Sequence, residues 1–361
     1  MVIEEKKVIL LAPTPPPAGG IARWTERMLN TELEDNWKIE LVDEKVIGGR
    51  EVFGSKTRKN ILVEVKRCMN IWKNLNIKLQ EKNAFVVHSC IPSETLSMLR
   101  EYVCACITKH YKKKFIIHFR CTVPNTTKGI IGNFLLKLLC KKSDRIIVLN
   151  NQSAEYLKTL TKTDLEIIPN FINISEMDCK REIKENINKI IYVGGVIKEK
   201  GCLDIIKVAE NFPEIEFRLV GKADENVKNI AQNNKNIVLV GTKNSDEIKK
   251  ELNSADVFLF LSYYKGEGFS NALAEAMAKG LPCIVTDWAA NADMIENKGG
   301  IVVPCKSPDK VIDAIKKMKD PNIRKIQSEF NINKVKMNYS DIIVIKRYVN
   351  VYEACLKEYQ T

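Results

Sequence analysis

The sequence predicts an α/β protein built from two doubly wound parallel sheets. Ten short apolar runs recur along its 361 residues, with amphipathic segments between them. Most runs are continuously apolar rather than alternating, which is typical of parallel strands covered by helices on both faces. The runs are residues 7–13, 85–89, 114–119, 145–150, 165–170, 189–195, 216–221, 236–241, 257–262 and 282–287.

The runs fall into two series, and the chain length is that of two ordinary domains. The second series begins after a charged stretch at 176–188, so we place the boundary near Pro169–Ile174. This predicts an N-terminal domain over 1–171 and a C-terminal domain over 172–342. A final amphipathic helix, about 343–361, is expected to join the first domain.

The charge of the chain is uneven. It carries 57 basic and 45 acidic side chains, a net charge of +12, but residues 51–150 hold 19 of the basic and only 6 of the acidic ones. A cationic region in a near-neutral protein indicates an anionic partner, which is a membrane surface, a nucleic acid or a phosphorylated substrate. The alternative is that these lysines line solvated helix faces.

Cysteine usage and hydropathy indicate the compartment. The eleven cysteines are scattered, no Cys-x-x-Cys occurs, and Cys104 and Cys106 have the wrong spacing for a zinc site. We therefore expect no metal and a reducing cytosol. The N-terminus begins with acidic residues, unlike a signal peptide, and no apolar run approaches the ~20 residues of a membrane span.

Ligands bind at the carboxyl ends of the strands in open α/β sheets, so the residues after each run matter most. Gly19 and Gly20 follow the first run and precede a helix, where backbone N–H groups can approach an anion. No G-x-G-x-x-G dinucleotide pattern accompanies them. His88 and His118 end two further runs, which predicts a place at the ligand-binding rim. The alternative is a structural, hydrogen-bonded role.

The segment 265–287 places the carboxylate of Glu275 among alanines. Ser270 is the predicted N-cap of a helix from Asn271 to about Lys279. A buried carboxylate needs a partner, and the ribose of a sugar nucleotide would supply it. Glu267, eight residues earlier, would then bind a second sugar, with phosphate at the helix start. The alternative is an ion pair between Glu275 and Lys279.

Seven segments, in the same order, resemble retaining glycosyltransferases of family 4 (glycosyltransferase group 1), which have the GT-B fold. The resemblance covers nearly the whole chain and implies two Rossmann-like domains facing across a cleft. The segments are residues 16–24, 115–119, 167–173, 192–206, 217–225, 236–262 and 267–287.

The resemblance implies a role for each matching residue. Lys200 would neutralise the leaving diphosphate, Glu267 would hold the donor sugar, and Glu275 would bind the ribose. His118 would contact the sugar near the reacting carbon. Glycines of both domains and the amides at the start of the predicted helix would line the donor site; these are Gly19, Gly20, Gly194, Gly195, Gly268, Phe269, Ser270 and Asn271.

One residue departs from the family pattern, because Gly195 stands where similar proteins often have an arginine beside the diphosphate. Lys198, Arg120 or a helix dipole would have to supply the second charge. A non-catalytic partner subunit that keeps the fold is therefore one alternative. A sugar-nucleotide epimerase or a glycogen phosphorylase-like enzyme is another. A basic nucleic-acid-binding protein is a third, although no aromatic stacking motif supports it and no nucleic acid is expected.

The resemblance implies a hexosyltransferase that needs neither metal nor cofactor. It would move a sugar with retention from a UDP- or GDP-linked donor to a saccharide or lipid-linked acceptor, in surface polysaccharide or glycolipid synthesis. Basic and apolar residues interleave in residues 56–73, and Lys112–Lys114 add charge. This pattern favours peripheral attachment to an anionic inner membrane face. The alternative is a core helix with a lysine-rich outside.

Overall fold

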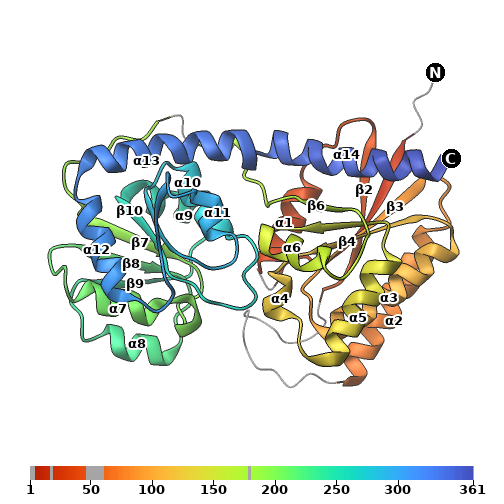
Figure 1. Cartoon of the computed structure of the whole chain (residues 1–361), viewed down its shortest axis with the longest axis horizontal. Coiled ribbons are helices and arrows are strands. Elements are labelled where there is room, and N and C mark those ends of the chain that lie inside the picture. Colours follow the sequence, from red (N-terminus) through yellow and green to blue (C-terminus); the bar gives the residue numbers. More distant parts are fainter. Residues whose placement is uncertain (1–4, 17–18, 46–60, 178–179, 361) are drawn as a thin grey trace. The chain divides into compact units, whose positions relative to one another are not determined.

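The computed structural model describes residues 5–16, 19–45, 61–177 and 180–360 (Figure 1). The chain divides into two compact units. Unit 1 comprises residues 1–170 and 344–361, and unit 2 comprises residues 171–343. The boundaries predicted from the sequence differ from these by one residue. The functions assigned to the two domains stay predictions.

Unit 1 contains a parallel six-stranded sheet in the order β2-β1-β3-β4-β5-β6. The direction of strand addition reverses between β1 and β3. The strands are β1 (Lys6–Ala12), β2 (Trp37–Asp43), β3 (Ala84–Ile91), β4 (Lys114–Phe119), β5 (Arg145–Val148) and β6 (Leu165–Ile167).

Helices cover both faces of this sheet. Three long helices lie side by side on one face (Figure 1), and the main apolar core of the unit fills the space beneath them. They are α2 (Ile61–Lys78), α3 (Thr95–His110) and α5 (Gly129–Lys142). The remaining helices are α1 (Gly20–Leu29), α4 (Val123–Thr126), α6 (Asn151–Lys158) and α14 (Asp341–Gln360).

Unit 2 contains a second parallel six-stranded sheet, in the order β12-β11-β10-β7-β8-β9. The strands are β7 (Lys189–Val193), β8 (Glu216–Val220), β9 (Ile237–Gly241), β10 (Val257–Phe260), β11 (Cys283–Thr286) and β12 (Gly300–Val303). The helical elements are η1 (Ile174–Glu176), η2 (Lys198–Lys200), α7 (Cys202–Ala209), α8 (Glu225–Ala231), α9 (Ser245–Ser254), α10 (Asn271–Ala278), α11 (Asn291–Ile295), α12 (Pro308–Met318), α13 (Pro321–Lys334) and η3 (Val335–Tyr339).

All ten apolar runs form strands, and the terminal amphipathic helix is α14. The sequence pattern missed β2 and β12. Both lie at an edge of their sheet. β2 alternates apolar with charged residues because an edge strand is partly solvated. β12 is short and begins at Gly300, where a Cβ would lie 1.9 Å from the Cys283 carbonyl oxygen.

Candidate functional site

The candidate site of unit 2 lies at the reversal point of its sheet. β7 and β10 are parallel neighbours, and the chain continues to β8 on one side and to β11 on the other. Gly194 and Gly195 follow β7, and residues 261–270 connect β10 to α10. Open α/β sheets bind ligands at such a point, outside the carboxyl ends of the strands.

Two of the predicted site residues meet there. Lys200, at the end of η2, forms an ion pair with Glu267 of the β10–α10 connection. The Ser262 hydroxyl donates to the same carboxylate oxygen over 3.1 Å. Lys200 Nζ also lies 4.9 Å from the centre of the Tyr264 ring. The two charged side chains are only 18% and 12% exposed, so any anion that binds Lys200 must compete with Glu267.

Hydrogen bonds hold the β10–α10 connection in place. The Tyr263 amide donates to the Glu199 carbonyl over 2.9 Å, which joins this connection to η2. Thr286 Oγ1 donates to the Ser262 carbonyl over 2.6 Å, and Trp288 Nε1 donates to the Tyr264 carbonyl over 2.8 Å. Glu267 and Lys200 are therefore positioned by three separate anchors.

Glycines make the close approach of these segments possible. Gly201 has φ +77°, and a Cβ there would lie 2.3 Å from the Leu261 carbonyl oxygen. The turn after Lys200 thus requires glycine because it packs against the end of β10. Gly195 differs, since a Cβ on it would meet nothing within 4 Å. The position where the family often has arginine is therefore sterically open.

The predicted helix after this connection is α10. Ser270 caps it as predicted, because its hydroxyl accepts from the Leu273 amide over 3.2 Å. Gly268, Phe269 and Ser270 are buried at the helix start, whereas Asn271 is partly exposed. The Phe269 side chain packs edge-on against Tyr339.

Glu275 is less buried than its alanine-rich surroundings predicted. The expectation of a buried carboxylate is wrong, because Glu275 is partly exposed while its neighbours Ala274 and Ala276 are buried. A half-buried carboxylate keeps part of its hydration, so burial alone does not demand a ligand. The predicted contact with a ribose stays a prediction.

In unit 1, Gly19 and Gly20 lie where the sequence placed them. Gly19 is the N-cap of α1, without a side-chain cap, and Gly20 is its exposed first residue. A Cβ on Gly20 would meet nothing within 4 Å. The two residues follow β1, which flanks the reversal point of this sheet.

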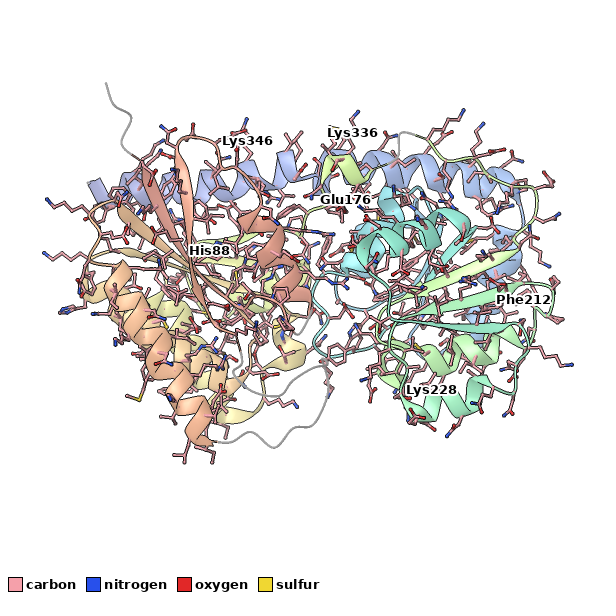
Figure 2. All side chains as sticks on the ribbon, turned by 180° about the vertical axis from the view of Figure 1, so that it is seen from behind. His88, Glu176, Phe212, Lys228, Lys336 and Lys346 are labelled. Carbon is pink, nitrogen blue, oxygen red and sulfur yellow. The ribbon has the colours of Figure 1, made fainter. Side chains whose placement is uncertain are left out.

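His118 lies near the carboxyl end of β4, as the sequence predicted, but its side chain is buried. Both His118 and His88 are fully buried in unit 1 (Figure 2 labels His88). His118 Nδ1 lies 3.1 Å from His88 Nε2, and its Nε2 lies 3.1 Å from Arg120 Nη1. Both ring nitrogens are thus hydrogen-bonded to protein groups, as the structural alternative expects, and the predicted contact with a sugar stays a prediction.

The positions of the protons in this hydrogen-bond network follow from Arg120, because an arginine side chain can only donate hydrogen bonds. His118 Nε2 must accept from Arg120, so His118 Nδ1 carries the proton and donates to His88 Nε2. His88 Nδ1–H then donates to the Tyr352 hydroxyl over 2.8 Å. Burial, aided by the Arg120 charge, lowers the pKa of His88 to about 3 and that of His118 well below its usual value.

Within the described residues, one group could hold a metal by composition, namely His88, Cys90 and His118. Its ring nitrogens are already joined by a hydrogen bond, and the Arg120 guanidinium donates to the far side of His118. A cation would have to displace these bonds next to a positive charge. The geometry therefore favours a hydrogen-bonded core.

The sequence argument missed the residues that enclose these histidines. Trp24 of α1 packs edge-on against both rings, and Tyr348 of α14 contacts both as well. Asn170 receives a hydrogen bond from Arg120. Tyr348 and Tyr352 lie four residues apart on the predicted terminal helix, so they share one helix face, which is the signal that could have found them.

Most of unit 2 matches a known protein family. Residues 173–334 match the family described as Glycosyl transferases group 1. The comparisons support a group 1 glycosyltransferase.

Three relatives match a longer stretch of the chain than unit 2 alone. An uncharacterized glycosyltransferase of Methanocaldococcus jannaschii is 26% identical over 67% of this chain and 69% of its own length. A UDP-Gal:α-D-GlcNAc-diphosphoundecaprenol α-1,3-galactosyltransferase of Escherichia coli is 28% identical over 60% and 65%. A processive diacylglycerol α-glucosyltransferase of Acholeplasma laidlawii is 24% identical over 66% and 83%.

Solved structures of low sequence identity share the fold of this protein. Sucrose-phosphate synthase of Thermosynechococcus elongatus superposes with a TM-score of 0.78 at 13% identity, covering 98% of this chain and all of the other. Anabaena HepE in complex with UDP gives 0.71 at 11% identity, covering 97% and all of the other chain. The predicted GT-B fold of two Rossmann-like units is confirmed, while how the units face each other stays a prediction.

The two glycines near Lys200 should respond oppositely to alanine. Gly201→Ala should destabilise unit 2 by roughly 1–3 kcal/mol, because it adds a Cβ at positive φ against the Leu261 carbonyl. Gly195→Ala should change stability little, since its Cβ meets open space. Chemical denaturation measures both. Equal stabilities of the two variants would contradict the close packing of η2 on β10.

The buried histidines should make folding stability fall with acid. Their folded pKa values lie below those of the unfolded chain, so unfolding takes up protons as pH falls through about 6.5. Each proton contributes about 1.4 kcal/mol per pH unit. Unfolding titrations between pH 7 and 5 should show this slope in the wild type. The double variant His88→Gln, His118→Gln should reduce it, and the control His110→Gln, on an exposed residue, should not.

Proposed function

We propose that this protein transfers a hexose, with retention of configuration and without a metal, from a UDP- or GDP-linked donor to a saccharide or lipid-linked acceptor. The observation that carries the proposal is the Lys200–Glu267 pair at the reversal point of the unit 2 sheet. Sequence resemblance assigned these two residues to one donor site, and they come from separate connections of the fold.

The charges suit a departing nucleoside diphosphate. The leaving group gains negative charge in the transition state, so a positioned Lys200 ammonium stabilises the transition state more than the ground state. Glu267, once released from Lys200, offers two carboxylate oxygens to the hydroxyls of the donor sugar. Glu275, one turn into α10, is exposed enough to accept hydrogen bonds from a ribose. Amides at the start of α10 add donors for phosphate.

The acceptor class rests on the printed activities of relatives. One acts on a diphosphoundecaprenol-linked sugar and another on a diacylglycerol. A third is named for capsular polysaccharide biosynthesis in Staphylococcus aureus. These names support a lipid-linked acceptor in surface polysaccharide or glycolipid synthesis at the inner face of the cytoplasmic membrane.

A non-catalytic subunit is the second candidate, because Gly195 lacks the arginine common in the family. The open space above Gly195 supports a simple test of this alternative. If Gly195→Arg creates nucleotide binding that the wild type lacks, the natural chain is a non-catalytic relative. If the wild type already binds and turns over a donor, the second charge comes from elsewhere in the chain.

A binding panel tests the donor proposal. Calorimetry with UDP, GDP, ADP and their common sugars should find one base that binds the full-length protein. Glu275→Gln should weaken that binding by about 1–3 kcal/mol, because it loses charge-assisted hydrogen bonds to the ribose. Transfer should persist in EDTA, and the product should keep the anomeric configuration of the donor. A wild type that binds no nucleotide would refute the proposal.

The surface of unit 1 supports membrane attachment. Large apolar side chains are exposed in the N-terminal halves of the three helices α2, α3 and α5, which lie side by side (Figure 1). We call this the apolar helix-start surface. It comprises Ile61, Leu62, Val65, Met69, Leu96, Leu99, Ile130, Ile131 and Phe134. The exposed Lys66, Lys73, Lys128 and Lys137 lie on the same helices or just before them, which suits an anionic bilayer.

This surface overlaps the basic segment 56–73 that the sequence predicted, and it adds apolar residues of α3 and α5. Residues 56–60 lie outside the described residues. Arg67 points inward and pairs with Glu64. Lys113 is buried against the Phe85 and Tyr359 rings, and Lys114 pairs with Asp144 and Glu358. Of Lys112–Lys114, only Lys112 is therefore exposed, and the contribution of these lysines to membrane binding stays a prediction. In the part of the chain that the structure describes, no helix is both long and apolar enough to span a bilayer.

Vesicle flotation tests this attachment. The wild type should float with vesicles that contain anionic lipid and less with zwitterionic ones. Ile130→Glu with Phe134→Glu should abolish flotation, because it places two carboxylates on the apolar helix-start surface. Ile326→Glu is the control, since the exposure of Ile326 lies between those of Phe134 and Ile130, but Ile326 lies on α13 of unit 2. Flotation that ignores lipid charge and the double substitution would contradict the proposal.

A further inference from the structure

Among the residues that the structure describes, Arg120 is a buried cation without an anionic partner. It directly follows β4 at the carboxyl edge of the unit 1 sheet and is 7% exposed. Its guanidinium donates to His118 Nε2 over 3.1 Å and to Asn170 Oδ1 over 2.5 Å. It also lies 4.3 Å from the centre of the Trp24 ring. All of these partners are neutral.

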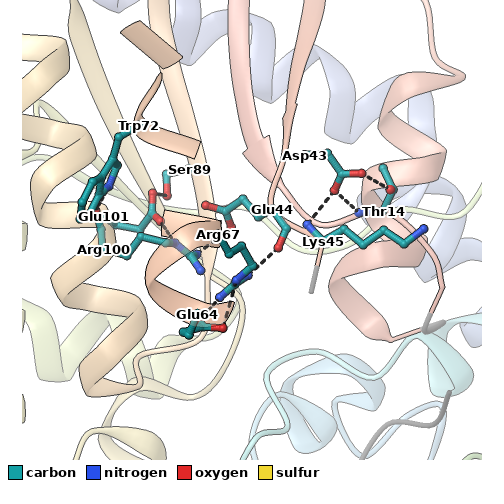
Figure 3. Close-up of polar contacts among 10 residues, drawn as sticks. All are labelled: Thr14, Asp43, Glu44, Lys45, Glu64, Arg67, Trp72, Ser89, Arg100 and Glu101. Atoms are coloured by element: carbon teal, nitrogen blue, oxygen red, sulfur yellow. Dashed lines mark hydrogen bonds and ion pairs between the residues drawn. The ribbon is translucent and has the colours of Figure 1, made fainter. Parts of the chain in front are cut away.

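The other strongly buried arginines of the described part of unit 1 are compensated. Arg100 donates to Glu44 over 2.8 Å and to Glu101 over 2.6 Å. Arg67 pairs with Glu64, and Figure 3 shows both arginines among these carboxylates. A buried charge without a counterion lowers the stability of a folded protein. No carboxylate of the described residues contacts Arg120.

The Arg120 guanidinium also has an N–H donor without an acceptor among the described residues. Arginine has five N–H donors, and His118 and Asn170 accept from only two nitrogens. Arg120 Nε is buried and makes no hydrogen bond. Tyr348 Oη is near enough to interact electrostatically with Arg120, but it too lacks a hydrogen bond of ordinary geometry. Burial raises the pKa of Tyr348, so its hydroxyl stays neutral and does not supply the missing charge.

We propose that Arg120 is an anion-binding residue of unit 1, and that its ligand is a phosphate group of a substrate. The site is built before the ligand arrives, since Trp24, His118 and Asn170 fix the guanidinium plane. A planar guanidinium held at a strand end suits the oxygens of a phosphate, which it can contact with two parallel N–H bonds. The carboxyl edge of the sheet is where such ligands bind.

The phosphate belongs to one of two substrates. Only the identity of these substrates rests on the proposed function. The phosphate is part of either the diphosphate of the nucleotide donor or the diphosphate of a lipid-linked acceptor. The probes are therefore inorganic pyrophosphate, UDP, GDP and farnesyl diphosphate, each titrated by calorimetry into the full-length protein. Loss of nucleotide affinity in an Arg120 variant assigns the donor, and loss of farnesyl diphosphate affinity alone assigns the acceptor.

Two substitutions give distinct expectations. Arg120→Gln should weaken the relevant diphosphate at least tenfold and leave the melting temperature of the ligand-free protein unchanged or higher, because an uncompensated charge is removed. Asn170→Asp keeps the side-chain shape but places a carboxylate on the guanidinium. It should raise the melting temperature and also weaken the diphosphate at least tenfold, because the new carboxylate competes with phosphate.

Arg145→Gln is the matched control. Arg145 already pairs with Asp164 and Glu358, so its loss should leave diphosphate affinity unchanged. A wild type that binds none of the four probes overturns the proposal. So does Arg120→Gln with a lowered melting temperature and full affinity, which indicates a purely structural residue. If Arg120→Gln fails to fold, unchanged affinity in Asn170→Asp overturns it instead.

The same titrations separate this inference from the proposed function. If Arg120→Gln weakens a diphosphate and Lys200→Gln does not, the Arg120 site stands and the donor site of unit 2 fails. The reverse pattern keeps the donor site and overturns the Arg120 inference.

Discussion

The ion pair between Lys200 and Glu267 is the constraint around which unit 2 is arranged. It joins η2, which follows β7, to the connection after β10, at the point where the sheet reverses direction. The pair exists because Gly201 lets η2 pack on the end of β10 and because Ser262 supports the carboxylate. Each charge neutralises the other, which offsets the cost of placing two charges in a partly buried environment.

In the described part of unit 1, Arg120 is buried among neutral groups and not beside a carboxylate. Arg120 polarises a chain of neutral groups from His118 through His88 to Tyr352, and the direction of every proton in that chain follows from the arginine. These hydrogen bonds join β3 and β4 to α14, whose residues from 344 onward belong to unit 1. The last helix of the sequence is thus part of the core around the strand that bears the candidate anion-binding residue.

The sequence predicted the strands well where their burial is complete. Continuous apolar runs indicate central strands, whereas β2 and β12 at the edges lack that signal. Ser270 as a helix cap and the meeting of Lys200 with Glu267 followed from local turn chemistry and from family resemblance. Burial of individual side chains did not follow. His118 is fully buried at a predicted ligand-binding rim, and Glu275 is only half-buried where burial was predicted. A one-dimensional pattern does not report which face of a strand or helix is covered by a distant segment such as α14.

We propose that phosphate and Glu267 compete for Lys200. The affinities of two isosteric variants for UDP or GDP test this competition most directly. Calorimetry with the nucleoside diphosphate that the wild type binds should show tighter binding to Glu267→Gln, because Lys200 is released from its ion pair. It should show weaker binding to Lys200→Gln, because the cation is lost. Opposite signs support the account. Weaker binding to both variants, or unchanged binding to both, would contradict it.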